Sequence, residues 1–171
     1  MRKMIGAAAV VSACFFAALS RLRAKRERIA LLFCLRDSLE VLQRELAERR
    51  VGMREIFSEL ARRSRCEAAV SFYEFLSGEM DKLGERSFST IWDGALHSAF
   101  SRQGEELVEI LSPLGICLGG SEIEPQLAAL QNAARQLQRT AETERAALPG
   151  EKRLSFGLSL SVGAMIVIML L

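Results

Sequence analysis

The sequence predicts an all-α protein, in which about six helices form a cytoplasmic bundle and a transmembrane helix flanks the bundle at each end of the chain. Three observations lead to this fold class. Apolar residues gather at both ends of the 171-residue chain, and charged and apolar residues alternate with helical spacing between them. Almost no stretch shows the two-residue alternation of a β-strand. We therefore expect an anchor at residues 1–20, a bundle at 21–150 and a second anchor at 151–171.

The first predicted anchor is a run of sixteen uncharged residues, 4–19. As a helix it measures about 24 Å, somewhat less than the ~30 Å hydrocarbon core of a bilayer. The basic side chains that flank it can reach the lipid headgroups and cover the difference. The second predicted anchor, residues 154–171, is eighteen residues long and measures about 27 Å.

Three interpretations of the N-terminal segment remain open. It is typical of a cleaved signal peptide, because Arg2 and Lys3 precede an apolar run, and residues 11–14 (Val-Ser-Ala-Cys) resemble a lipoprotein signal. The third interpretation is a retained anchor, which the charges favour. Five basic residues lie within residues 21–28, against two before the segment, and such a cluster holds its side of the membrane in the cytoplasm. Lys152 and Arg153 orient the second segment in the same way, so both place the middle of the chain in the cytoplasm.

Helical periodicity runs through the middle of the chain. The first helix is predicted to continue from the anchor and to end before Gly52, with leucines at spacings of three and four residues on one face: Leu32, Leu35, Leu39, Leu42 and Leu46. A short helix is predicted from Met53 to Ala61, and a third near residues 67–83. Aromatic residues at core spacing follow, and we expect them to be buried: Phe72, Phe75, Phe88, Trp92 and Phe100.

Serine, glycine and proline mark the ends of the later helices. Ser87 has the position of an N-cap for the fourth helix, and Gly119-Gly120 closes the fifth, with Pro113 predicting a kink or a late start. The sixth helix is expected to begin at Ser121 or Glu124 and to end at a break at Pro149-Gly150.

No catalytic, metal or cofactor site is indicated. The four cysteines are 20, 32 and 51 residues apart and the only histidine is His97, so no zinc motif is present, and we expect free thiols. Asp93 precedes His97 by one helical turn, but no nucleophile accompanies the pair. Residues 115–120 (Gly-Ile-Cys-Leu-Gly-Gly) lack the Lys-Ser/Thr of a phosphate-binding loop. Residues 20–153 hold 21 basic and 21 acidic residues, which argues against a nucleic-acid partner.

Several motifs together resemble one family across essentially the whole chain. They are Leu39-x-x-Leu42-x-x-Glu45-Leu46, Trp92 after a serine-rich cap, Leu114-Gly115-x-x-Leu118-Gly119-x-Ser121-Glu122 followed by Gln126, and Gly157 and Gly163 in the C-terminal apolar run. With these motifs the chain resembles the stage III sporulation protein AB family of endospore-forming bacteria. It departs from the family pattern at Glu122, where Asp is usual, at Val51-Gly52-Met53, where a Thr-Pro-Leu-like turn is usual, and at Pro149-Gly150.

The resemblance implies a non-enzymatic part of the channel complex between mother cell and forespore, located in the mother-cell (outer forespore) membrane. The family is similar to the cytoplasmic domains of the inner-membrane platform protein of type II secretion and type IV pilus systems. By that analogy the bundle would dock a cytoplasmic secretion-type ATPase and contact other membrane proteins of the complex. An exported or lipid-anchored helical protein with an extracytoplasmic interaction role is the alternative.

We expect partner binding at residues 115–126, which we name the corner segment, because a loop held between two helices makes a rigid recognition surface. The candidate residues are Gly115, Leu118, Gly119, Ser121, Glu122 and Gln126. The same glycines are also consistent with a purely structural corner between two helices.

Overall fold

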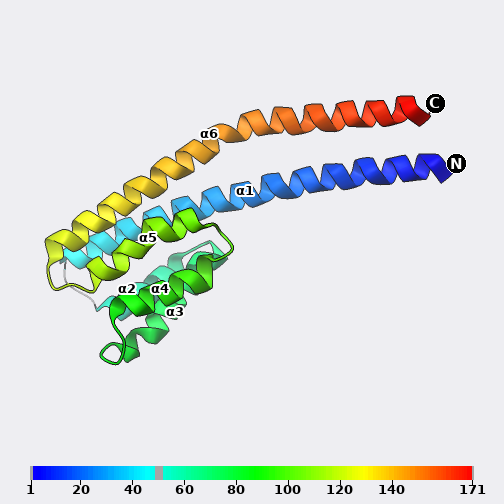
Figure 1. Cartoon of the computed structure of the whole chain (residues 1–171). Coiled ribbons are helices and arrows are strands. Elements are labelled where there is room, and N and C mark those ends of the chain that lie inside the picture. Colours follow the sequence, from blue (N-terminus) through cyan, green and yellow to red (C-terminus); the bar gives the residue numbers. More distant parts are fainter. Residues whose placement is uncertain (1, 49–51, 171) are drawn as a thin grey trace. The chain divides into compact units, whose positions relative to one another are not determined.

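The computed structural model describes the backbone of residues 2–48 and 52–170 and the side chains of residues 16, 17, 19–48 and 52–148. The elements shown in Figure 1 are α1 (Arg2–Glu48), α2 (Met53–Arg63), α3 (Glu67–Glu79), the short 3-10 helix η1 (Met80–Lys82), α4 (Phe88–Phe100), α5 (Glu105–Leu118) and α6 (Ile123–Leu170). In these ranges no strand is present, only a single bridge between Leu83 and Arg86. The all-α class and the six helices are therefore confirmed.

The chain divides into two compact units. One is formed by Met1–Ile29 with Glu142–Leu171, and the other by Ala30–Ala141. In the first unit Arg28 of α1 donates a hydrogen bond from Nε to Glu144 Oε1 of α6, at 2.7 Å, with both side chains only about a quarter exposed. The second unit holds the hydrophobic core and all the elements from α2 to α5.

The predicted anchors, residues 4–19 and 154–171, lie almost wholly outside the residues whose side chains are described. Within the described part, no helix is apolar over a stretch long enough to cross a bilayer. Both anchors, and the domain boundaries drawn from them, stay predictions.

The leucine stripe of α1 forms one wall of the bundle. Leu32, Leu35, Leu39 and Leu42 are each at most 2 % exposed, and Leu46 packs against the core from a partly buried position. Spacings of three and four residues place these side chains on one face of a helix. The prediction of a long helix that is continuous with the N-terminal apolar run and ends before Gly52 is confirmed, since α1 spans Arg2–Glu48.

Helix α6 differs from the prediction at both ends. It begins at Ile123, between the two predicted starts, which puts Pro125 in the first turn, where a backbone N–H has no helical partner to lose. The predicted break at Pro149-Gly150 is wrong, because α6 continues to Leu170. A proline inside a helix removes one backbone hydrogen bond and costs about 3 kcal/mol. The helical hydrogen bonds of the turns before and after Pro149 offset that cost, so α6 continues through it. Helix α5 likewise runs through Pro113, which lies on its exposed side.

The third predicted helix ends earlier than expected, and one of its faces was misassigned. Phe75 was expected in the core but is 38 % exposed, and Leu83, at the predicted end of this helix, is 49 % exposed, whereas Tyr73 is completely buried. Phe72, Tyr73 and Leu76 form the inward stripe of α3, and Phe75 lies at its edge. Leu83 follows η1 and precedes Gly84, whose φ of 115° turns the chain away from the helix.

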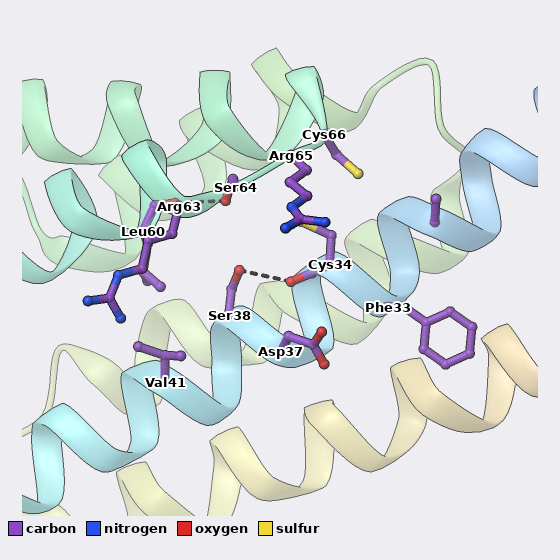
Figure 2. Close-up of a pocket in the computed structure, with 11 residues that line it drawn as sticks. Phe33, Cys34, Asp37, Ser38, Val41, Leu60, Arg63, Ser64, Arg65 and Cys66 are labelled. Carbon is purple, nitrogen blue, oxygen red and sulfur yellow. Dashed lines mark hydrogen bonds between the residues drawn. The ribbon is translucent and has the colours of Figure 1, made fainter.

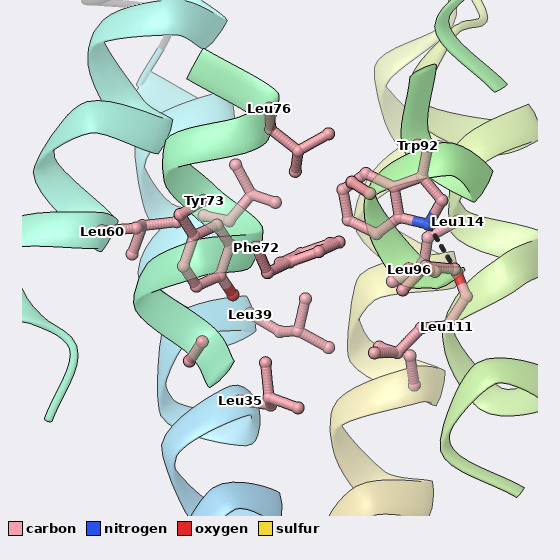
Figure 3. Close-up of a cluster of buried hydrophobic side chains, with 14 of the residues drawn as sticks. Leu35, Leu39, Leu60, Phe72, Tyr73, Leu76, Trp92, Leu96, Leu111 and Leu114 are labelled. Atoms are coloured by element: carbon pink, nitrogen blue, oxygen red, sulfur yellow. Dashed lines mark hydrogen bonds between the residues drawn. The ribbon is translucent and has the colours of Figure 1, made fainter. Parts of the chain in front are cut away.

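An aromatic cluster occupies the centre of the second unit. Figure 3 shows Phe72 of α3 pointing toward Trp92 and Leu96 of α4, with Tyr73 beside Phe72 on the side of Leu60 and with leucines of α1 and α5 nearby. The rings of Phe72 and Trp92 meet edge to face, with centroids 5.1 Å apart. Edge-to-face pairs of this kind add to the gain from burial. Four of the five aromatics expected in the core are thus buried, with Phe75 the exception.

Candidate functional site

The corner segment joins α5 to α6, and the structure separates its candidate residues into two groups. Gly115, Leu118 and Gln126 are buried and pack inside the corner. Gly119, Ser121 and Glu122 are exposed at its tip. The six residues therefore lie close together in the fold, and only the second group is accessible to a partner.

Gly115 allows α5 to approach α4 closely. A β-carbon at this position would lie 2.8 Å from Cδ1 of Trp92 and 3.0 Å from its Cβ. Trp92 cannot move aside easily, because it is completely buried and its indole N–H donates to the carbonyl of Leu111, at 2.8 Å. The glycine is needed for helix packing rather than for backbone freedom, since its position is helical.

Gln126 ties the start of α6 to the end of α5. Its side-chain Nε2 donates to the carbonyl of Gly120 at 2.7 Å and lies 3.5 Å from the carbonyl of Leu118. The last carbonyls of a helix have no partner within the helix, so this amide satisfies groups that would otherwise be left open.

We expect the Gln126→Ala substitution to lower the free energy of unfolding by about 1–2 kcal/mol, because it leaves partly buried carbonyls without a donor. The measurement is urea unfolding of the full-length chain in detergent, followed by circular dichroism. Gln131→Ala, on the exposed side of the same helix, is the matched control and should change stability little. Equal effects of the two substitutions would contradict the role given to Gln126.

The exposed tip contains one residue that the sequence analysis did not select. Ile116 of α5, one turn before the glycines, is 76 % exposed. The corner segment therefore exposes one large apolar side chain, Ile116, as well as the polar Ser121 and Glu122. The sequence could have indicated the exposure of Ile116, because this residue lies outside the apolar stripe formed by Leu107, Leu111, Leu114 and Leu118.

Asp93 and His97 of α4 are not joined by a hydrogen bond in the structure. The carboxylate of Asp93 accepts a hydrogen bond from the hydroxyl of Ser112 on α5, at 3.0 Å. His97, one turn further along α4, is exposed. Over the described side chains, no cluster of three or more His, Cys, Asp or Glu residues has the arrangement of a metal site.

A groove of about 410 Å³ runs between α1 and the connection from α2 to α3. Figure 2 shows its walls, with Cys34, Asp37 and Ser38 on α1 and Arg63 to Cys66 opposite them. The groove is open to solvent and mixes thiol, hydroxyl and charged groups with apolar side chains.

The described helices define an all-α bundle with an exposed corner between α5 and α6 and an open groove beside α1. The model of the stage III sporulation protein AB family matches residues 3–171, and the chain therefore belongs to this family. The resemblance noted from the sequence motifs is thereby confirmed, and with it a place among sporulation proteins. Neither a search of curated proteins nor a search of solved structures found a match.

Proposed function

We propose that this protein is a membrane-anchored platform that docks a cytoplasmic secretion-type ATPase in the channel complex between mother cell and forespore. Its membership of a stage III sporulation family is the observation that carries the proposal. The protein holds the ATPase at the membrane through its helical bundle and does not hydrolyse ATP itself.

The long terminal helices support an anchored arrangement. α1 is continuous from the N-terminal apolar run into the core of the bundle, and α6 is continuous from the bundle into the C-terminal apolar run. A helix that continues from an apolar run into the bundle connects the two parts of the chain without a flexible linker, as expected of an anchored protein. The basic residues just inside each apolar run favour a cytoplasmic bundle.

The exposed tip of the corner segment is the docking surface in this proposal. Ile116 supplies an exposed apolar anchor, and Ser121 and Glu122 supply exposed polar groups of the same corner segment. Apolar anchors surrounded by polar groups account for most of the affinity in protein interfaces. The buried Gly115 and Gln126 hold this surface in place and do not themselves meet the partner.

The docking surface is tested by binding the purified ATPase to liposomes that carry the full-length protein. We expect Ile116→Asp and Glu122→Lys each to weaken binding by about tenfold or more. Glu74→Lys, a reversal of charge at an exposed position on α3, is the control and should bind like the wild type. Wild-type binding by both corner variants, with unchanged melting, would remove the corner segment from the interface.

The membrane arrangement is tested separately. A reporter enzyme fused near residue 90 should be active only on the cytoplasmic side, and activity only outside would overturn the proposal. The mature N-terminus, read by mass spectrometry, distinguishes the rival function, because cleavage before Cys14 or after Ala18 is compatible only with an exported or lipid-anchored protein.

A further inference from the structure

Cys34 and Cys66 lie on facing walls of the groove between α1 and the start of α3. Cys34 belongs to α1, Cys66 is the residue immediately before α3, and both side chains are half-buried. Both line the same groove, which is open to solvent (Figure 2). The two thiols are therefore near each other in the fold, although 31 residues separate them in the sequence, and small solutes can reach them.

We propose that Cys34 and Cys66 are a modification site, at which a low-molecular-weight disulfide such as glutathione disulfide converts the two thiols reversibly into an intramolecular disulfide. This site is independent of the proposed platform function. The new bond would tie α1 to the beginning of α3 and close residues 34–66 into a loop.

The reaction takes place in two exchange steps. The thiolate of Cys34 attacks one sulfur of glutathione disulfide, which breaks the S–S bond, forms a mixed disulfide on Cys34 and releases one glutathione thiolate. The thiolate of Cys66 then attacks the Cys34 sulfur and releases the second glutathione thiolate. Both thiolates leave the protein as glutathione after protonation by water, so two cysteine thiols are oxidised and one glutathione disulfide is reduced.

Cys66 is assigned the second step because its thiol ionises less readily than an ordinary cysteine. Burial, then the charge of Cys34, then a side-chain hydrogen bond with Cys34 raise the pKa of Cys66 to about 11. Two of these three causes come from Cys34, in keeping with the place of both residues along the same groove. Once Cys34 is in a mixed disulfide it has neither a charge nor an S–H group, so both of its contributions to the raised pKa of Cys66 are removed.

The other charged or titratable groups near the thiols are Asp37 on α1, Arg63 and Arg65 on the opposite wall, and Tyr73 on α3. Asp37 pairs with Arg36, at 3.0 Å, and Arg63 pairs with Glu59. Burial raises the pKa of Tyr73 well above its ordinary value, so it is a neutral phenol over the whole range used below. The closing step is therefore expected to quicken by up to about tenfold per pH unit between pH 7 and 9, as the thiolate fraction of Cys66 grows.

The test uses the full-length chain in detergent, with Cys14 and Cys117 replaced by Ser so that only the groove thiols remain. The protein is incubated with glutathione disulfide at pH 8.5, treated with N-ethylmaleimide and weighed by mass spectrometry. We expect a product that lacks two hydrogens and carries no maleimide, and that accepts two maleimides after dithiothreitol. Peptide mapping should join Cys34 to Cys66, and the melting temperature of the oxidised protein should rise by about 5 °C.

Single variants provide the controls. Cys34→Ser and Cys66→Ser in the same background should each stop at one glutathione adduct or one maleimide. The proposal is wrong if the protein that retains both Cys34 and Cys66 also accumulates only glutathione adducts. It is also wrong if this protein still reacts with two maleimides after prolonged oxidation at pH 8.5. It is equally wrong if the disulfide forms no faster in the folded protein than in 8 M urea, because the fold then does not bring the thiols together.

Discussion

Replacing Trp92 by alanine is expected to cause the largest loss of stability of any single truncation in the bundle, about 3–5 kcal/mol. Trp92 is completely buried and its ring lies within 5.1–6.4 Å of three phenylalanine rings, those of Phe57, Phe72 and Phe88, measured between centroids. The substitution leaves a cavity among helices α2, α3 and α4. It also removes the hydrogen bond that the indole N–H donates to the carbonyl of Leu111.

The measurement is urea unfolding of the full-length chain in detergent, followed by circular dichroism, because Trp92 is the only tryptophan and its fluorescence is lost in the variant. Trp92→Phe is the matched control. It keeps most of the packing but loses the hydrogen bond, so about 1–3 kcal/mol is expected. If Trp92→Ala and Trp92→Phe destabilise the protein equally, the packing of the indole ring is not what holds α4 in the bundle.

The second large effect is expected at Gly115. Gly115→Ala should lower the free energy of unfolding by about 1–3 kcal/mol, although alanine is the better helix former, because its β-carbon would collide with Trp92. The collision is with a ring that packing and a hydrogen bond hold in place, so α5 has to move away from α4. The same urea titration measures this loss.

Gly94→Ala is the control, and we expect it to raise the free energy of unfolding rather than lower it. Gly94 is in the middle of α4 and exposed, and its added β-carbon would meet only the ring of Phe75, at 4.0 Å. We expect a gain of about 0.5–1 kcal/mol from helix propensity. A gain at Gly115 as well would show that α4 and α5 are not in close contact there.

The Gly115→Ala variant also tests the role of Gly115 in the candidate site. If Gly115→Ala weakens ATPase binding only in proportion to its loss of stability, the glycine acts by holding the corner segment. A fall in binding at a temperature where the variant is fully folded would instead indicate that the position of α5 sets the docking surface. The Ile116→Asp variant is the comparison for Gly115→Ala, because Ile116 is exposed and its replacement disturbs no core packing.

The sequence was a good guide where a single helix and its own periodicity decide the outcome. The leucine stripe of α1 is buried as its spacing predicts, and Ser87 caps α4 by accepting a hydrogen bond from the N–H of Thr90. Both depend on interactions within a few residues of chain. The prediction failed at Phe75 and at Pro149-Gly150, where local rules compete with packing or with the length of helix on either side.

For the candidate site, the sequence located the corner segment but not the roles of its residues. It could not tell that Gly115 faces Trp92, that Gln126 reaches back to Gly120, or that Ile116 points outward, since each depends on how α4, α5 and α6 pack. The proximity of Cys34 and Cys66 was also hidden, because their separation in sequence carries no spacing signal.

By itself the sequence determined the all-α class, the approximate helix limits, the balanced charge of the middle and the family, because these follow from composition, periodicity and short motifs. The tertiary structure alone decided which side of each helix is buried and which residues far apart in sequence become neighbours. The physical reason is that burial and close contact between helices are properties of their relative placement, which the pattern of any one helix does not contain.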